Sequence, residues 1–328
     1  MTTATGVVVL SARAQRLHRA LFRGNSLTMD NPDYRRTAGE LMALLLRGDS
    51  AKRDLTVEAL GLKHRSGVAV VVAKECGVAA GLDETALLLE AHGVVARLER
   101  KDGAPIIAGD ALLHLSGDVG TLLSLERVVL NVLQRMSGVA TAARNLADRA
   151  RLCSSITHIV GTRKTPWGLL DKRALHLGHC GTHRLGLADA ILIKNNHLAL
   201  LASREEEAVR PAIERAWALR HESAFIEVEV RGEAAARKAA QTFQRLQEDD
   251  DSEEYPCLLL LDNMSPAGAA SALDMLRRER LWDSILVEAS GGINDENLDA
   301  YAACGVDAIS IGALTHSTRA LDLSQTLS

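Results

Sequence analysis

Polar and charged residues stand directly after, or at the end of, apolar runs at six places in the second half of the chain. In chain order they are Thr162 to Thr165, Lys194 to His197, Glu227 with Glu229, Asp262 with Asn263, Ser290 to Gly292, and Gly312. The carboxyl ends of parallel strands meet at one mouth of an α/β barrel, where barrel enzymes place their chemistry. Six such ends in succession predict one shared polar site, because charged groups at strand ends are costly unless they are paired or used.

The charges in this set are of two kinds. The cations are Arg163, Lys164, His183, Arg184 and Lys194, and Arg127 could join them from a preceding helix. So many cations predict a polyanionic ligand, because arginine binds carboxylate and phosphate groups alike. The acids are Glu229 and Asp262, with Glu227 or Glu288 as further candidates. Mg²⁺ usually takes one or two carboxylates together with substrate phosphates, so the acids indicate a magnesium site and contacts to sugar hydroxyls.

Two late turns have the composition of a phosphate cradle. Ser290, Gly291 and Gly292 precede a helix expected to begin near Asp295, and Gly312 follows the last strand. Glycine lets the backbone approach an anion, and barrels often bind phosphate at their last two loops. The chain has no GxxxxGK(S/T) or GxGxxG motif, which disfavours nucleoside triphosphates and dinucleotides as ligands.

A competing set of residues could bind zinc instead. His176, His179, Cys180 and His183 lie within eight residues and offer zinc-ligand chemistry. Glycines interrupt any helix here, so these side chains need not share one face. We favour a functional pair of His183 and Arg184, with His176 and His179 structural, and we keep metal binding as the alternative.

The residues between these turns predict the elements that position the site. A helical pattern at 38–46 precedes short β-like runs at 68–73, 94–98 and 111–115. Apolar residues recur at intervals of three and four over 125–151, which predicts one long helix. Strand-like runs then alternate with helical stretches. The expected strands are 156–161, 191–194, 225–230, 258–261, 285–288 and 308–311, and the expected helices are 170–177, 204–220, 233–247, 266–280 and 295–303.

Repeated βα units with nearly continuous apolar strands predict a parallel sheet, and six of them favour closure into a barrel. The predicted fold class is α/β: a C-terminal parallel α/β barrel with a smaller N-terminal α+β domain. The expected boundaries are 1–128 for the N-terminal domain, 129–315 for the catalytic barrel and 316–328 for a C-terminal tail. The acidic run 248–254 is expected to be a solvated loop.

Composition excludes several classes of function. The 328 residues carry a net charge of -4 and only 3% aromatic residues, which argues against a nucleic-acid partner. No apolar run is long enough to span a membrane, so no membrane partner is expected. Five scattered cysteines without a CxxC pair indicate a cytoplasmic location. Arginines at 13, 16, 19 and 23 make the N-terminal segment basic, and we expect a surface helix there, with an organelle transit peptide as the alternative.

A series of motifs resembles the quinolinate phosphoribosyltransferase family, also called decarboxylating nicotinate-nucleotide pyrophosphorylase. In chain order the motifs are ERVVLNVLQRMSGVAT, GTRKT, THRLGLADAILIKNNH, IEVEV, LLLDN, EASGGIN and GVDAISIGALTHS. The resemblance is specific from about Leu125 to Ser317. Before that it is faint, and rests on RGDSAKRDLTVEAL and AKECGVAAGL.

This resemblance implies an enzyme, a decarboxylating pentosyltransferase of NAD biosynthesis. Such an enzyme makes nicotinate mononucleotide, pyrophosphate and CO₂ from quinolinate and phosphoribosyl pyrophosphate, with Mg²⁺. Members of the family are dimers whose sites are shared. A homodimer or larger homo-oligomer is therefore expected, in which Arg127 reaches the site of a partner subunit.

The resemblance also implies a role for each site residue. Arg163, His183, Arg184 and Lys194 would hold the quinolinate carboxylates, and Lys164 would lie near them and near the pyrophosphate. Glu229 and Asp262 would face the ribose and the metal. Ser290, Gly291, Gly292 and Gly312 would bind the 5′-phosphate. Lys164, Lys194, Glu229 and Asp262 are the expected catalytic residues.

Three departures from the family pattern bear on the substrate. Asn195 stands where the family usually has Asp, the segment 165–172 is about two residues short, and Gly178 to Gly181 replaces a glycine-rich run. We expect all three near the pocket for the aromatic acid. Two alternatives therefore stay open: a related phosphoribosyltransferase for another aromatic acid, and a family member associated with molybdenum transport, supported only by the cluster from His176 to His183.

Overall fold

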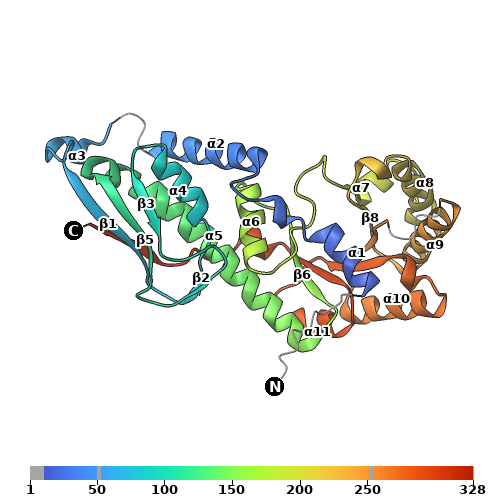
Figure 1. Ribbon diagram of the computed structural model, residues 1–328. Coiled ribbons are helices and arrows are strands. Elements are labelled where there is room, and N and C mark those ends of the chain that lie inside the picture. The colour runs from blue at the N-terminus through green and yellow to red at the C-terminus, as the bar shows by residue number, and fades with distance from the viewer. Residues whose placement is uncertain (1–10, 50–52, 251–254, 328) are drawn as a thin grey trace, which may run out of the picture. The chain divides into compact units, whose positions relative to one another are not determined.

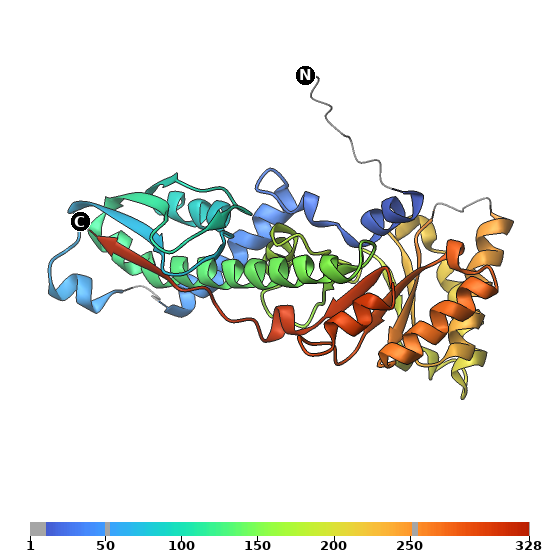
Figure 2. The same ribbon diagram turned by 90° about the horizontal axis from the view of Figure 1, so that it is seen from below.

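The structure, a computed structural model, describes residues 11–49, 53–250 and 255–327 (Figures 1 and 2). The chain folds into two compact units, each made of three separate stretches. The α/β unit contains the described parts of 1–23, 149–160 and 183–311, and the α+β unit contains those of 24–148, 161–182 and 312–328. In the described part of the chain, no helix is both long and apolar enough to cross a membrane.

Strands and helices alternate in the α/β unit, as the predicted βα repeats require. Its strands are β6 (His158–Gly161, whose last residue belongs to the other unit), β7 (Ile191–Ile193), β8 (Ile226–Val230), β9 (Cys257–Asp262), β10 (Leu286–Ser290) and β11 (Ala308–Ile311). Its helices are α1 (Ala12–Leu21), α7 (Asn195–Leu198), α8 (Glu205–Trp217), α9 (Glu233–Asp249), α10 (Pro266–Arg278) and α11 (Leu298–Ala303), with short 3₁₀ turns at Arg220–Glu222 and Trp282–Ser284. The six strands match the expected ranges to within two residues.

The strands form one sheet in the order β6-β11-β10-β9-β8-β7. The ladders from β7 through β11 are parallel, so the predicted α/β class with a parallel sheet is confirmed. Among the described residues β6 and β7 are the ends of this order, and no ladder joins them into a hydrogen-bonded ring. Helices α8 and α9 contact each other and cover β8 and β9 from outside (Figure 1).

The other face of the sheet is covered at its amino end by α1. Leu17 and Leu21 of α1 are buried in one cluster with residues at the start of the strands, among them Phe225, Leu258 and Leu286. Burial of an aliphatic side chain stabilises a fold by roughly 1.5–3 kcal/mol. The expected surface helix is therefore present: the apolar stripe of α1 is a part of the core, and its other side is exposed.

The N-terminal arginines have partners within the same unit. Arg13 forms a bidentate ion pair with Asp307, with N–O distances of 2.5 and 2.6 Å, and its guanidinium stacks over Trp282. Arg23 pairs with Asp189 at 2.9 Å. The basic character of this segment thus serves to attach α1 to the sheet.

The acidic run that we expected as a solvated loop begins within a helix. Helix α9 continues to Asp249, and Asp250 accepts a hydrogen bond from the indole Nε1 of Trp217 at 2.6 Å. Residues 251–254 lie outside the described residues. The first part of the run is therefore structured, which the charge pattern alone did not indicate.

The α+β unit is built on an antiparallel sheet in the order β12-β1-β5-β3. The strands of this unit are β1 (Ser66–Ala73), β2 (Gly77–Val78), β3 (Val95–Leu98), β4 (Pro105–Ile106), β5 (Ala111–Asp118) and β12 (Leu323–Leu327). Its helices are α2 (Pro32–Asp49), α3 (Leu55–Ala59), α4 (Leu82–Glu90), the long α5 (Val119–Cys153, in this unit to Asp148), α6 (Leu169–Leu177) and α12 (Ala313–His316), with a 3₁₀ turn at Gly24–Ser26.

Residues after 315, which we expected to be a tail, include a strand of this sheet. Strand β12 pairs along the whole of Ala69–Ala73 in β1, and the two ribbons run side by side in Figure 2. A hydrogen bond from the backbone N–H of Leu321 to the carbonyl of Gln134 on α5 fixes the approach to it. The C-terminal residues are therefore structural in the α+β unit.

Arg173 of α6 is the centre of a buried ion cluster in the α+β unit. Its guanidinium lies 2.9 Å from Glu84, 2.9 Å from Asp83 and 3.2 Å from Asp102, and Tyr34 donates to Glu84 at 2.5 Å. Burial, together with the charge of Glu84, raises the pKa of Asp102 to about 7. Since one cation faces three acids, this cluster makes stability depend on pH.

We expect Asp102→Asn to reduce that dependence. The unfolded Asp ionises near pH 4, while folded Asp102 keeps its proton to about pH 7. The folded state thus binds more protons in this window, and stability falls as pH rises from 4 to 7, by on the order of 2 kcal/mol. Asn cannot ionise and still accepts from the N–H of Leu82, which bonds to Asp102 at 3.0 Å.

Urea unfolding at pH 5 and pH 8 measures this effect. The difference in the free energy of unfolding between the two pH values should shrink in Asp102→Asn. Asp110→Asn is the control. Hydrogen bonding to the N–H of Ile107 lowers the pKa of Asp110, so this group is ionised in both states at pH 5 and pH 8, and its replacement should leave the difference unchanged. An unchanged pH dependence in Asp102→Asn would contradict the assignment.

Candidate active site

The carboxyl ends of β7 to β10 place the predicted polar residues of the α/β unit on one face. Asp262 ends β9 and Ser290 ends β10, and the two are paired in register. Glu229 on β8 is paired with Leu260, two residues before Asp262 and on the same face. At the amino ends of the strands, the same face packs against Leu17 and Leu21 of α1. The strands thus run from an apolar amino end to a polar carboxyl end.

Glu229 and Asp262 lie together, and Asn195 bridges them. The side-chain amide of Asn195 donates to Oε1 of Glu229 at 2.5 Å and to Oδ2 of Asp262 at 3.3 Å. Arg231 contacts the same Asp262 oxygen at 3.2 Å. Burial and the neighbouring charge of Asp262 raise the pKa of Glu229. Two carboxylates that point at a common amide can equally face a cation or a developing positive charge.

The structure shows what the side chain of Asn195 contacts. We expected the departure at this position to lie near the pocket for the aromatic acid. In the structure the Asn195 side chain contacts the two acids. An aspartate here would place a third carboxylate beside them, whereas the amide supplies donors and leaves the local charge less negative.

Beneath the two acids is a buried group of His183, Glu227 and Glu288. Nε2 of His183 lies 2.9 Å from Glu227 and 3.6 Å from Glu288. Burial, opposed by the cations Arg184 and Lys194, raises the pKa of Glu227 to about 8. Among the described residues this is the one group of His, Cys, Asp and Glu side chains that is compact enough for a metal ion.

The hydrogen bonds of His183 argue against a metal ion in this group. The backbone N–H of Arg184 donates to Nδ1 of His183 at 2.8 Å. Nδ1 must then present its lone pair, so Nε2 carries the proton of the neutral ring and has no lone pair for a metal. A carboxylate oxygen of Glu227 lies 2.9 Å from that Nε2.

The zinc set that we considered from the sequence finds no support in the described residues. The compact group contains none of His176, His179 and Cys180, and both ring nitrogens of His183 have partners. The thiol of Cys180 is buried and donates to the carbonyl of Ala143 at 3.2 Å. Cys180 and His183 therefore each have contacts of their own and do not form one ligand set.

Arg184 and Lys194 bring positive charge to the acids of this unit. Arg184 is buried, and its Nη1 donates to the carbonyl of Ala190 at 3.1 Å. Lys194 is exposed and follows β7 directly, where its backbone begins α7. The positive charges of Arg184 and Lys194 both lower the pKa of Glu227 and so offset part of the increase that burial causes. The unit therefore combines two carboxylates with two cations, which suits a substrate that carries negative charge and develops positive charge.

The Ser290-Gly291-Gly292 turn requires glycine at its centre. Gly291 and Gly292 have φ of +96° and +63°, and a Cβ on Gly291 would lie 2.3 Å from Oδ1 of Asn263. The hydroxyl of Ser310 donates to that of Ser290 at 2.7 Å. Such a turn leaves backbone groups open to an anion, as expected for a phosphate cradle.

The helix after this turn begins later than predicted. It starts at Leu298 instead of near Asp295 and has six residues. The backbone N–H of Asn294 donates to Oδ1 of Asn297, and Oδ1 of Asn294 accepts from the backbone N–H of Glu296, so these residues form a turn instead. Any anion binding here therefore depends on the turn itself.

The α+β unit holds the remaining predicted residues, Arg163, Lys164, Gly312 and Arg127. A Cβ built on Gly312 would lie 3.2 Å from Cδ of Lys164 and 3.1 Å from Nε2 of His316, so Lys164 passes over this glycine. Arg163 and Lys164 are exposed on the loop after β6. Arg127 is exposed on α5, and no hydrogen bond described here joins it to that loop.

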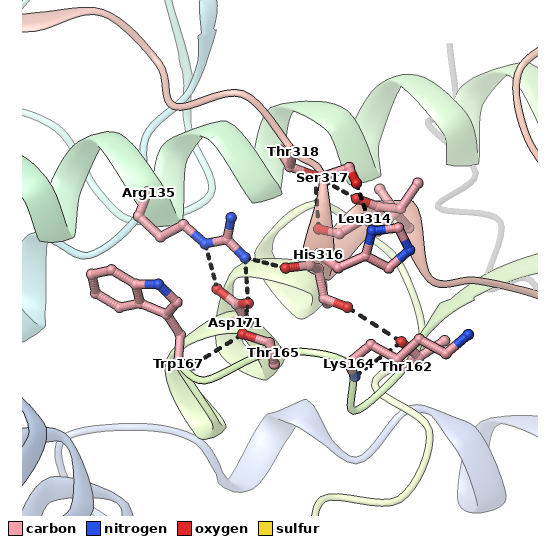
Figure 3. A network of polar contacts seen from close by, with 12 residues as sticks. Arg135, Thr162, Lys164, Thr165, Trp167, Asp171, Leu314, His316, Ser317 and Thr318 are labelled. Carbon is pink, nitrogen blue, oxygen red and sulfur yellow. Dashed lines mark hydrogen bonds and ion pairs between the residues drawn. The ribbon is translucent and has the colours of Figure 1, made fainter.

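A charged network that the sequence did not reveal fixes this loop (Figure 3). Arg135 of α5 pairs with both oxygens of Asp171, at 3.0 and 2.6 Å, and donates to the carbonyl of Thr315 at 2.5 Å. Thr165 donates to the same carboxylate at 2.6 Å. Asp171 is fully buried. The network ties the loop that carries Arg163 and Lys164 to the segment that begins at Gly312.

The signal for this network in the sequence was weak. Arg135 follows the apolar stretch VVLNVLQ of a helix whose neighbours Leu133 and Met136 are buried. An arginine inside such a stretch indicates a buried partner. Nothing in the spacing identified Asp171 as that partner, because the two are distant in sequence.

Comparisons with known proteins agree with this arrangement. The model of the quinolinate phosphoribosyl transferase C-terminal domain matches residues 139–326, and that of the N-terminal domain matches 54–137. A probable nicotinate-nucleotide pyrophosphorylase (carboxylating) of Methanothermobacter thermautotrophicus is 35% identical over 290 residues, 87% of this chain and 97% of that protein. A nicotinate-nucleotide pyrophosphorylase (carboxylating) of Mycobacterium leprae is 34% identical over 278 residues, 82% of this chain and 89% of that protein.

Solved structures lead to the same conclusion. The crystal structure of NadC from Streptococcus pyogenes superposes with a TM-score of 0.73 at 31% identity, covering 88% of this chain and 96% of that one. Two family models that together span most of the chain, and relatives above 30% identity over most of their length, identify the family. The chain belongs to the quinolinate phosphoribosyl transferase family.

Proposed function

We propose that this protein transfers the phosphoribosyl group of phosphoribosyl pyrophosphate to quinolinate with loss of CO₂, which gives nicotinate mononucleotide and pyrophosphate for NAD biosynthesis. The observation that carries the proposal is the pair Glu229 and Asp262 at the carboxyl ends of β8 and β9, with the positive charge of Lys194 acting on Glu229. The relatives' name describes the reverse direction, in which pyrophosphate and CO₂ are consumed.

The proposed roles follow the charges of the reaction. As the bond from C1′ of the ribose to pyrophosphate breaks, C1′ gains oxocarbenium character, which Glu229 and Asp262 would stabilise. The ring nitrogen of quinolinate forms the new bond to C1′. The two carboxylates would be held by Arg163, His183, Arg184 and Lys194, which orient the ring. The carboxylate beside the nitrogen then leaves as CO₂, and the ring carbon keeps the electron pair and takes a proton.

The remaining residues of the set would bind phosphate groups. Lys164 would contact the pyrophosphate and the quinolinate carboxylates. The turn at Ser290, Gly291 and Gly292, together with Gly312, would bind the 5′-phosphate, because glycine lets the backbone approach an anion and the space beside Gly292 is open.

Mg²⁺ is the proposed cofactor, and the residues fit it. Oxygens of Glu229 and Asp262 accept from the same amide nitrogen of Asn195 and so face one point, and carboxylate oxygens are the ligands that Mg²⁺ prefers. When bound with phosphoribosyl pyrophosphate, the ion would neutralise charge on the leaving group. The two carboxylates would hold and orient that complex.

We further propose that the protein is a homodimer or a larger homo-oligomer with shared sites. Arg127 is exposed on α5, as a residue that serves the site of a partner subunit would be. The resemblance to a family of such dimers supports this assignment.

A product assay tests the proposed function. Purified protein, quinolinate labelled in the carboxyl group beside the nitrogen, phosphoribosyl pyrophosphate and Mg²⁺ should release labelled CO₂ and nicotinate mononucleotide in equal amounts, and chelation of Mg²⁺ should stop the reaction. Nicotinate is the matched control, since it lacks that carboxyl group. Absence of product, or a preference for nicotinate or another monocarboxylate, would contradict the assignment and favour the alternative of a different aromatic acid.

A further inference from the structure

The loop that follows β6 closes on itself through one buried carboxylate. The hydroxyl of Thr165 donates to Oδ2 of Asp171 at 2.6 Å, and the backbone N–H of Trp167 donates to the same hydroxyl oxygen at 3.0 Å. Gly168, with a φ of +54°, then turns the chain into α6. This is the segment that is about two residues shorter than the family pattern, and in this chain the side chain of Asp171 holds its two ends together.

Arg135 of α5 fixes the position of Asp171. Its Nε and Nη2 lie 3.0 and 2.6 Å from the two carboxylate oxygens, and the exposed fractions of the side chains are 15% for Arg135 and 0% for Asp171. A bidentate pair of arginine and carboxylate is strong and sets the geometry of both groups. Because Asp171 is fully buried, it does not itself contact a substrate.

The same network also holds the other side of the loop (Figure 3). Arg135 donates to the carbonyl of Thr315 in α12 at 2.5 Å. The hydroxyl of Thr315 lies 3.2 Å from that of Thr162, and the Thr162 oxygen accepts from the backbone N–H of Lys164 at 3.2 Å. The backbone of the loop is therefore fixed on both sides of Arg163.

The two cations of this loop depend on such an anchor. Arg163 and Lys164 are exposed, so the direction of each side chain depends on the backbone that carries it. A long cationic side chain loses rotamer freedom when it binds an anion, and a fixed backbone reduces the freedom that remains to be lost. A displacement of about 1 Å is enough to weaken an oriented contact. The affinity of the loop for an anion therefore depends on the network that fixes it.

We propose that Asp171 is a positioning residue for the aromatic acid: with Arg135 it fixes the loop so that the guanidinium of Arg163 meets a carboxylate of the substrate. Asp171 touches neither that acid nor any reacting atom. The inference rests on the proposed function, and it adds to the site a buried carboxylate that lies outside the set of predicted ligands.

Calorimetry with quinolinate tests this arrangement without turnover. Asp171→Asn removes the charge that holds Arg135 and should raise Kd for quinolinate about tenfold. Arg163 is the loop residue that we assign to the aromatic acid alone. In an Arg163→Ala background, Asp171→Asn should therefore change Kd less than about twofold, because the residue through which Asp171 acts is already absent. An effect as large in that background as in the wild type would overturn the inference.

Asp307→Asn is the matched control. Asp307 is also a buried aspartate in a bidentate pair with an arginine, Arg13, but it bonds to the backbone N–H of Val287 near the amino end of β10, away from the carboxyl ends of the strands. Its substitution breaks the same kind of contact and should leave Kd for quinolinate within about twofold of the wild-type value. A similar loss of affinity in both variants would mean that Asp171 acts only through the stability of the fold, and the inference would be wrong.

A double variant serves if Asp171→Asn does not fold. Arg135→Met combined with Asp171→Leu replaces the buried ion pair by apolar side chains, which proteins often accept without loss of stability. The folded double variant should lose quinolinate affinity as Asp171→Asn does, because the hydroxyl of Thr165 has then lost its acceptor. Wild-type affinity in that protein would contradict a positioning role. Wild-type protein that binds no quinolinate and makes no product would instead count against the proposed function.

Discussion

Lys194→Ala is expected to lower kcat/KM by about 1000-fold or more while the protein stays folded. In the proposed reaction the ammonium group of Lys194 orients a carboxylate of quinolinate and stabilises negative charge near the ring. Removing a charge that is aimed at the reacting groups costs both binding and rate. Steady-state kinetics with each substrate varied in turn measure the loss.

The structure explains why this variant should keep its fold. The side chain of Lys194 is exposed, and the hydrogen bonds that stabilise the fold at this position are made by its backbone. The carbonyl of Lys194 accepts from the N–H groups of His197 and Leu198, and its N–H donates to Nδ1 of His197 at 2.9 Å. Alanine keeps all three bonds, so the melting temperature should change by only a few degrees.

Two further variants complete this test. Arg163→Ala removes a predicted carboxylate ligand of the α+β unit and should be similarly inactive. Lys238→Ala is the matched control, because Lys238 lies on α9 and belongs to no part of the proposed site. Near-normal activity in Lys194→Ala or Arg163→Ala would show that the assignment of the carboxylate ligands is wrong.

Local patterns predicted the α/β unit well because its strands carry their own signal. Strand β9 is the continuous apolar run CLLLLD, and it ends where the apolar residues end. Parallel strands that are buried on both faces have such continuous apolar sequences. A polar residue that ends the run is then expected at the carboxyl end of the strand. Asp262 could therefore be placed beside Ser290 before the register was known.

Elements that depend on distant partners could not be predicted in the same way. Strand β12 has five residues with polar side chains among them, and it is a strand because β1 offers an unpaired edge. The arginines of helix α1 predicted a surface helix, but they did not indicate which acids pair with this basic segment. Its partners, Asp307 and Asp189, lie far along the chain.

The hydrogen bonds within the site could likewise not be predicted from the sequence. The carboxylates of Glu229 and Asp262 indicated a metal or ribose site. The hydrogen bonds from the amide of Asn195 to both acids depend on side-chain rotamers, which the sequence does not show. The tautomer of His183 follows from a single backbone N–H, that of Arg184. Spacing identified the residues that could act, and the structure identified those that are already bound to one another.

Arg127→Ala is expected to be as inactive as Lys194→Ala, and mixtures of the two variants should regain activity. In the proposed oligomer Arg127 serves the site of a partner subunit, whereas Lys194 serves the site of its own chain. A heterodimer of the two variants then has one site with both residues intact and one site with neither. Random exchange makes half of the dimers mixed, so the mixture should reach about a quarter of wild-type activity.

Differently tagged variants give the sharper form of this experiment. Heterodimers purified through both tags should have about half of the wild-type activity per dimer, because one of two sites is complete. Each variant alone, carried through the same exchange, is the control. Purified heterodimers without activity would show that Arg127 and Lys194 do not belong to complementary subunits. Full activity in Arg127→Ala would remove Arg127 from the site altogether, because an arginine that binds a substrate anion cannot be lost without cost.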